Sequence, residues 1–241
     1  MPHIPPAKRH PYDQWSPDAR ALDLVGDKWT LLIVRDLISG PRRFVELQRV
    51  LPGISTEQLR SRLNRMVADG MLTRKRYREV PPRVDYELTE RALALAPVIG
   101  ELARWGYGWA WSPPRQLEAV DVGAIFRLLP GLLPSGAQTS GRVDFTVIDG
   151  RDGDETTVYS MVIGDHGVYL TEHGPEQELP GGDADATARG SAGAWVRALG
   201  PDPDVSDLEF SGRRELTSLV LETLSPGESR LERTVPESAA S

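Results

Sequence analysis

The sequence predicts a mainly α domain built on a helix-turn-helix and a two-stranded β-ribbon, followed by an α+β domain. Three observations predict this order. A capped amphipathic helix over residues 54–70 follows a shorter helix and a Pro52-Gly53 turn. Two short alternating segments, separated by a proline-containing loop, come directly after that helix. Beyond residue 116 the pattern changes to strands between apolar helical stretches, which is typical of α+β domains.

Length and composition set limits on the protein class. With 241 residues, of which 39% are apolar, the chain has room for two compact domains. It contains no cysteine, which excludes disulfides, thiolate metal ligands and a cysteine redox switch. No basic leader or long apolar run opens the sequence, so we expect a cytoplasmic protein.

The net charge of -7 hides a division between the two halves of the chain. Residues 1–115 hold 19 Lys and Arg against 13 Asp and Glu, whereas the remainder holds 9 against 22. A positively charged half suits contact with phosphate. The acidic half would repel DNA and confine contact to one surface, or would only provide a soluble exterior.

The first segments of the chain predict an arm and three helices. Residues 1–15 are rich in proline and basic side chains, without periodicity. Residues 17–25 and 27–39 have helical spacing, and Gly40-Pro41 stops the second of them. Residues 44–51 have the spacing of a short amphipathic helix. We expect the first two helices to pack behind the helix-turn-helix.

The helix over residues 54–70 has capping signals at both ends. Ser55 and Gln58 have the spacing of a capping box, in which each side chain bonds the other's backbone N–H. Ile54 and Leu59 have the spacing of a hydrophobic staple. Gly70 stands where a left-handed C-terminal cap is favoured. The apolar stripe of this helix consists of Leu59, Leu63, Met66 and Val67.

The outer face of this helix and the ribbon after it share a basic character. Residues 71–77 and 84–88 alternate like strands, and the loop between them contains Pro81-Pro82, so the pair predicts a wing. Between residues 60 and 83 there are eight basic residues and two acidic ones. A basic solvated helix is common on protein surfaces, but this context favours a DNA recognition helix.

The predicted contacts fall into two classes. Side chains that could reach base edges in the major groove are Thr56, Gln58, Ser61, Arg62 and Arg65, of which Arg62 lies nearest the apolar stripe. Side chains predicted to contact phosphates are Arg60 on the helix flank and Arg74, Lys75, Arg76, Arg78 and Arg83 on the ribbon.

Residues 90–111 predict a longer helix that is kinked or broken near Pro97. It ends in four aromatic residues, which are Trp105, Tyr107, Trp109 and Trp111. Such a cluster fits either a core or a dimer contact, and both interpretations stay open. Gly106-Tyr107-Gly108 lacks the third glycine of a dinucleotide fingerprint, so no dinucleotide site is predicted there.

Several motifs in this order resemble the HxlR family of winged helix-turn-helix transcriptional regulators. They are the runs Ala21 to Thr30 (ALDLVGDKWT), Arg43 to Leu47 (RFVEL), Gly53-Ile54-Ser55 and Val80 to Thr89 (VPPRVDYELT). The resemblance covers about residues 12–111. It implies a homodimer that binds a pseudo-palindromic operator, with the terminal helices forming the dimer interface. Many relatives carry a cysteine where Ser16 stands here, so thiol-based sensing is not available to this chain.

After a linker over residues 112–116, the second half predicts an α+β domain. Residues 122–133 are an apolar helical stretch interrupted by Pro130-Gly131. Turn signals separate the segments that follow. The predicted strands are 142–148, 157–163, 168–171 and 183–189, and the predicted helices are 193–199 and 213–224.

This order of elements, over about residues 120–226, is similar to the sterol carrier protein 2 fold. The resemblance rests on the strand-turn-strand around residues 164–167, the small-residue strand before the helix of Trp195, and Phe210-Ser211-Gly212 before the last helix. It implies an apolar pocket for a lipid-like ligand, lined by Phe126, Leu129, Phe145, Met161, Tyr169, Trp195 and Leu224. A filled core would contain the same residue types.

No set of catalytic residues can be assembled, because the sequence has no nucleophile elbow, no H-E-x-x-H and no phosphate-binding loop. A metal shared by His166 and His173 lacks a supporting carboxylate or thiolate pattern, so no cofactor is expected. The sequence predicts a transcriptional repressor released by a small apolar ligand. Two alternatives stay open. The second domain could serve only for dimerisation or interaction with partners, or the chain could be an enzyme that acts on a lipid-like substrate, although the sequence does not indicate a reactive group for it.

Overall fold

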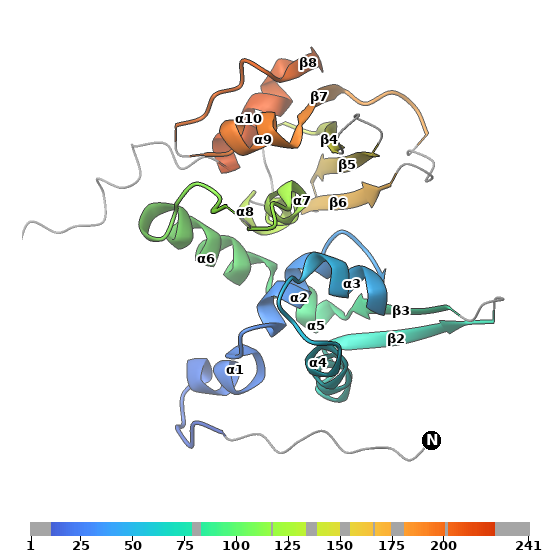
Figure 1. Ribbon diagram of the computed structural model, residues 1–241, viewed down its shortest axis with the longest axis vertical. Helices are drawn as coiled ribbons and strands as arrows, with labels where there is room; N and C mark the ends of the chain where they lie inside the picture. The colour runs from blue at the N-terminus through green and yellow to red at the C-terminus, as the bar shows by residue number, and fades with distance from the viewer. Residues whose placement is uncertain are drawn as a thin grey trace, which may run out of the picture. The chain divides into compact units, whose positions relative to one another are not determined.

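The structure, a computed structural model, describes most of the chain and divides into two compact units, Met1–Ala96 and Pro97–Ser241 (Figure 1). The described residues are 11–78, 83–116, 118–133, 139–149, 155–165, 167–174, 181–200 and 202–224. The predicted arm over residues 1–15, the loop over residues 79–82 and the position of His166 fall wholly or partly outside them. Each unit is described by itself.

Four helices form most of the first unit. They are α1 (Pro17–Val25), α2 (Thr30–Leu37), α3 (Phe44–Val50) and α4 (Thr56–Ala68), in the order that the sequence predicts. The Oγ atom of Ser16 accepts a hydrogen bond from Ala19 N at 3.2 Å, so this residue caps α1. The helix α2 begins three residues later than predicted, because Asp27 accepts hydrogen bonds from the N–H groups of Trp29 and Thr30.

The small sheet of this unit has the order β1-β3-β2 within the described residues. The strands β2 (Leu72–Tyr77) and β3 (Arg83–Leu88) pair antiparallel, as the ribbon prediction requires. The strand β1 (Arg42–Arg43) adds a two-residue edge that the sequence does not predict. Every residue of β2 after Leu72 is exposed, so the ribbon reaches beyond the core of the unit.

The core of the first unit collects the apolar faces of these helices. The side chains of Leu59, Leu63 and Met66 on α4 are almost fully buried, as the predicted stripe requires. They share the interior with Ile33 of α2 and Leu47 of α3. The helix α4 is therefore held by burial of one face, which leaves its opposite face to solvent.

The predicted helix over residues 90–111 is broken, as Pro97 indicates. The helix α5 (Glu90–Leu93) ends before Ala94-Leu95, and α6 (Ala96–Trp109) follows. Pro97 lies in the first turn of α6, where its missing N–H leaves no intrahelical bond unmade. The division between the units falls at this point, so α6 groups with the second unit.

The second unit is an α/β region around a mixed sheet. In the described residues the strand order is β6-β5-β4-β7-β8, with β4 and β7 parallel and the other neighbours antiparallel. The strands are β4 (Gly141–Asp149), β5 (Glu155–Gly164), β6 (Gly167–His173), β7 (Ala186–Ser191) and β8 (Glu209–Gly212). The sequence predicts the first four of these strands, although the predicted β7 begins three residues too early, at residue 183. It does not predict β8.

Helices from three segments pack on one face of this sheet. They are α7 (Val122–Phe126), α8 (Leu129–Leu132), α9 (Ala192–Ala198) and α10 (Arg214–Leu224). Their apolar side chains join the inward residues of the strands in one buried cluster. The stretch over residues 122–133 breaks at Arg127-Leu128 and not at Pro130-Gly131, because Pro130 occupies the first turn of α8, where proline is tolerated.

Among the described residues, no helix combines the length and the apolar character that crossing a bilayer requires.

Candidate nucleic-acid interface

The start of α4 has the geometry that the sequence predicts. Gln58 N donates to Ser55 Oγ and Ser55 N donates to Gln58 Oε1, each at 3.2 Å, which forms a capping box. Gly70 has a φ of 68° beyond the end of the helix. The cap uses the Oε1 atom of Gln58, and a bidentate contact to adenine needs both amide atoms. Gln58 is therefore primarily a capping residue in this structure.

The exposed face of α4 presents Thr56, Arg60 and Ser61 to solvent, whereas Arg65 is half-buried. Thr56 Oγ1 accepts a hydrogen bond of 2.7 Å from Gln48 Nε2, which ties the start of α4 to α3. The Arg60 guanidinium lies 5.9 Å from the centre of the Phe44 ring. These contacts fix the two helices of the helix-turn-helix against each other.

Arg62 has a different role from the base contact that the sequence suggests. Its Nη1 atom lies 3.0 Å from Asp27 Oδ2, and both side chains are mostly buried. Asp27 also accepts hydrogen bonds from Trp29 N at 2.9 Å and Thr30 N at 3.1 Å. The pair therefore joins α4 to the start of α2. The reason is angular position, because Arg62 lies beside the apolar stripe and faces the unit's own helices.

This contact gives a first testable expectation. We expect Arg62→Met and Asp27→Asn to weaken DNA binding by similar factors, because each removes the same contact between α4 and α2. Asparagine at position 27 keeps an oxygen that can cap α2. The double variant should bind about as well as either single one, as for any pair that acts through one interaction. Fluorescence anisotropy on labelled DNA measures this. A distinctly larger loss for Arg62→Met than for Asp27→Asn would instead assign Arg62 to DNA.

The ribbon carries basic side chains on both faces of β2. Alternation along the strand places Arg74, Arg76 and, just beyond the strand, Arg78 on one face, and all three are exposed. Lys75 on the other face pairs with Glu87 of β3. The hydrogen bond and the charge of this carboxylate raise the pKa of Lys75. Lys75 therefore stays protonated, but its charge is already compensated within the ribbon.

Arg83 is also used within the ribbon. Its Nη2 atom lies 2.7 Å from Asp85 Oδ2, and its guanidinium lies 5.5 Å from the centre of the Tyr77 ring. The carboxylate of Asp85 is almost fully buried. Arg83 thus supplies the partner that a buried charge requires. Arg74, Arg76 and Arg78 are exposed on one face of β2, whereas Lys75 and Arg83 pair with acidic side chains. These three arginines are therefore the ribbon side chains that we most expect to contact phosphate.

With this geometry established, comparison with known proteins identifies the first half of the chain. Residues 24–113 match the HxlR-like helix-turn-helix family. An uncharacterized HTH-type transcriptional regulator of Halalkalibacterium halodurans, BH0655, is 42% identical over 94 residues, which span 39% of this chain and 83% of that protein. Another from Bacillus subtilis, YvaP, is 37% identical over 90 residues, or 37% of this chain and 83% of that one. The chain belongs to the HxlR-like helix-turn-helix family.

Membership decides the general role of this HxlR-like protein, which is a transcriptional regulator with a helix-turn-helix DNA-binding domain. A further relative named as such a regulator, sll1512 of Synechocystis, is 39% identical over 93 residues, which span 39% of this chain and 69% of its own length. The family match ends at residue 113. The part of the second unit that follows α6 therefore lies almost entirely outside the range that the family match covers.

The residues predicted to line a ligand pocket in this HxlR-like regulator separate into two groups. Six of them are fully buried in the core of the second unit: Phe126, Leu129, Phe145, Met161, Trp195 and Leu224. Tyr169 is 61% exposed, so its assignment to the pocket is wrong. It pairs with Val162 on the outer face of the sheet, whereas its neighbour Leu170 pairs with Met161 on the inner face.

Aromatic rings fill the middle of this core. The Phe126 ring lies 5.0 Å from the centres of the Phe145 and Trp195 rings and 5.2 Å from that of Tyr159. Trp195 Nε1 donates a hydrogen bond of 2.9 Å to Thr146 O, which satisfies the buried indole. A ligand would have to lie beside these rings or part them on binding.

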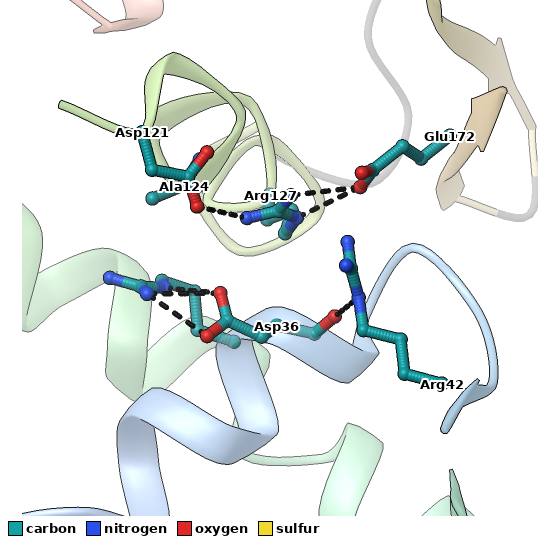
Figure 2. A network of polar contacts seen from close by, with 7 residues as sticks. Asp36, Arg42, Asp121, Ala124, Arg127 and Glu172 are labelled. Atoms are coloured by element: carbon teal, nitrogen blue, oxygen red, sulfur yellow. Dashed lines mark hydrogen bonds and ion pairs between the residues drawn. The ribbon is translucent and has the colours of Figure 1, made fainter. Parts of the chain in front are cut away.

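A buried arginine that the sequence analysis did not single out joins α7 to the sheet. Arg127 is 1% exposed, and Figure 2 shows its guanidinium between two carboxylates. Its Nη1 atom lies 2.8 Å from Asp121 Oδ2, and its Nη2 atom lies 2.9 Å from Glu172 Oε2 of β6. Asp121 also caps α7 by accepting from Ala124 N. The sequence signal that could have identified Arg127 is its position as an arginine inside an otherwise apolar helical stretch.

A similar polar contact orders the first unit. Asp36 is fully buried on α2, and its carboxylate accepts hydrogen bonds from Arg35 at 2.9 and 3.1 Å. Arg42 Nε donates to the backbone oxygen of the same residue at 2.7 Å (Figure 2). These bonds hold the end of α2 against β1. They support the helix-turn-helix and do not reach the exposed face of α4.

Among the described residues, no three or more His, Asp and Glu side chains are grouped so that they could hold a metal ion. His173 instead lies 3.0 Å from Thr171 Oγ1 on the same strand. His166, the second histidine that the sequence analysis considered, lies outside the described part of the chain.

Proposed function

We propose that this regulator binds a pseudo-palindromic operator as a homodimer, with α4 in the major groove and the β2–β3 ribbon on the phosphate backbone. The observation that supports this most directly is that one unit carries both surfaces that such binding needs, the exposed face of α4 and the basic face of the ribbon. The outer face of α4 is polar and exposed, and Arg74, Arg76 and Arg78 line one face of the adjacent ribbon. Side chains on α4 would read bases, and the ribbon would supply affinity that does not depend on sequence.

An apolar stripe on α6 supports the dimer. Val98, Leu102, Trp105 and Trp109 are 52%, 52%, 59% and 72% exposed. Their spacing of four, three and four residues places them on one helix face. Such a stripe suits pairing with the same stripe of a second copy about a two-fold axis. The four aromatic residues at the end of this helix would then divide between the two roles, because Tyr107 stacks on Trp111 within the unit.

For the second unit we favour a sterol-carrier-protein-2-like role, in which a small apolar ligand lowers operator affinity and so releases a repressor. The functional domains would then span residues 12–111 and 120–226. Six predicted lining residues in one buried apolar cluster support this role. The ring contacts of Phe126 support the alternative, which is an interaction or dimerisation module without a ligand. Melting of the protein with and without apolar small molecules would separate the two.

The experiment that tests the central proposal is a fluorescence-anisotropy titration of the full chain. The probes are labelled DNA from upstream of the protein's own gene and random DNA of equal length, at two salt concentrations. Tighter binding to the upstream DNA, with strong salt dependence for both, is the expected result. Equal and weak binding to both probes would contradict sequence-specific reading.

Two single substitutions should separate the two contact classes. We expect Arg65→Ala to weaken binding to the upstream DNA more than to random DNA, because a lost base contact costs about 1–3 kcal/mol of discrimination. Arg78→Ala should weaken both by the same factor and reduce the salt dependence. The anisotropy assay measures both ratios. Equal losses on the two probes for both variants would refute this division of labour.

A further inference from the structure

The helix α6 has two opposite faces, and both lie within the second unit. At 100° per residue, Gly100, Arg104 and Tyr107 fall on the side opposite to the exposed stripe of Val98, Leu102, Trp105 and Trp109. Gly100 is buried, and the other two residues of its face are half-buried. The helix that carries the proposed dimer surface thus has an inner face that packs on its own chain.

The inner face meets α8 backbone to backbone. A Cβ atom built on Gly100 would lie only 2.6 Å from Gly131 O and 2.8 Å from Gly131 C, so the two helices approach as closely as glycine allows. Arg104 Nη2 donates a hydrogen bond of 2.6 Å to Leu132 O. This carbonyl belongs to the last residue of α8, where helix carbonyls have no intrahelical partner. The contact is short and leaves little freedom for sliding.

The far end of the helix has a second attachment. The Tyr107 ring stacks on Trp111 with 5.1 Å between ring centres. The Cζ2 atom of Trp111 lies 3.8 Å from the position of a Cβ atom on Gly200, just beyond α9. Burial of the phenol raises the pKa of Tyr107 to about 12, so the ring stays neutral at physiological pH. The helix α6 is therefore fixed to the second unit near both of its ends.

The element that holds α6 also belongs to the core of the proposed ligand-binding unit. Leu129, Leu132 and Leu133 are buried in the same cluster as Phe126 and Trp195. Arg127, just before α8, is tied to β6 through Glu172 (Figure 2). A rearrangement of this core would therefore move α8, and the close contact at Gly100 would pass the movement to α6.

We propose that the α6–α8 contact couples the second unit to DNA binding, by setting the position of the exposed stripe through which two copies pair. This inference rests on the proposed dimeric operator binding. Only two residues separate α6 from α5, so the stripe through which two copies would pair is joined to the unit that carries α4 by a short connection. Half-sites one helical turn apart lie about 34 Å from each other, and a small shift removes several contacts at once. Packed backbones transmit such shifts because they do not deform gradually.

The test compares two Gly→Ala variants on the same helix. Gly100→Ala inserts a methyl group into the contact with α8, whereas a Cβ atom on Gly106 would meet nothing within 4 Å. Both substitutions raise helix propensity equally, so their difference isolates the contact. We expect Gly100→Ala to weaken binding to the upstream DNA by about tenfold or more relative to Gly106→Ala. Equal affinities of the two variants would overturn the proposal.

Reciprocity supplies a second readout, because coupling must act in both directions. Binding of the upstream DNA should change the hydrogen-exchange rates of α8 amides in the wild type and in Gly106→Ala, but not in Gly100→Ala. Unchanged exchange in all three proteins would contradict coupling. If Gly100→Ala disrupts the second unit, Arg104→Gln removes only side-chain contacts and should give a smaller change in the same direction. No change for Arg104→Gln would then count against the proposal.

Failure of this proposal can be distinguished from failure of the proposed function. If the wild type binds no upstream DNA, operator binding is refuted, and sedimentation equilibrium still tests the contact at α6. A dimer dissociation constant that differs between Gly100→Ala and Gly106→Ala would support control of the α6 surface by α8. The same constant for both variants would refute it.

Discussion

Truncation of Phe126 to alanine is expected to lower the free energy of unfolding of the second unit by about 3–5 kcal/mol. The Phe126 side chain is fully buried, and the rings of Phe145, Tyr159 and Trp195 surround it at centre distances of 5.0 to 5.2 Å. Removal of the ring therefore costs both its transfer from water and the cavity that remains. Chemical denaturation of the full chain, followed by fluorescence and by exchange of β4 amides, measures the loss.

The matched control is Tyr169→Ala in the same unit. Tyr169 is an aromatic residue at a position that is 61% exposed, so its truncation should change the free energy of unfolding by less than about 0.5 kcal/mol. A loss below about 1 kcal/mol for Phe126→Ala would mean that the ring borders open space. That outcome would favour a ligand cavity at this position. The full loss would favour a packed centre and place any ligand beside it.

The contrast between these two aromatic residues also shows what sequence patterns can predict. Alternation predicted the strands of the meander correctly, but the strand β6 is short and has apolar residues on both faces. Val168 and Leu170 face the core, whereas Tyr169 faces outward opposite Val162. Because successive residues of a strand point to opposite sides, composition alone does not say which face is inward. The pairing with β5 decides it, and that pairing depends on distant segments.

The first unit was more predictable because its signals are local. The capping box of Ser55 and Gln58, the positive φ of Gly70 and the break before Pro97 each depend on residues within one helical turn. The role of Arg62 was not predictable in this way. Its partner Asp27 stands 35 positions earlier, so only the packing of α4 against α2 brings the two side chains together.

The grouping of α6 with the second unit was missed for a similar reason. Its exposed stripe is visible in the sequence, but its inner face depends on Gly100 meeting Gly131 of a helix with only four residues. A glycine inside a helix lowers helix propensity and gives no local indication of its partner. The close approach of two backbones explains why glycine is found at position 100. This contact is the physical basis for grouping α6 with the second unit.

The other large effect is expected at the ribbon. We expect the triple variant Arg74→Ala, Arg76→Ala, Arg78→Ala to lose much of its affinity for upstream and random DNA alike. If each arginine neutralises one phosphate, the slope of log K against log salt should fall by about 0.9 per contact, or about five for a dimer. The three side chains share an exposed face of β2, whereas Lys75 and Arg83 pair with acidic neighbours. Their charge is therefore the part of the ribbon best placed to contact phosphate.

A charge-matched control separates contact from overall charge. The variant Arg115→Ala, Arg189→Ala, Arg214→Ala removes three exposed arginines of the second unit and changes the net charge equally. It should keep a salt slope close to that of the wild type if the second unit makes no phosphate contacts, because the slope reports the number of phosphates that are contacted and not the net charge. Equal slopes for the two triple variants would show that net charge alone governs binding. A larger decrease of the salt slope for the ribbon variant than for the control would locate the phosphate contacts on the face of β2 that carries the three arginines.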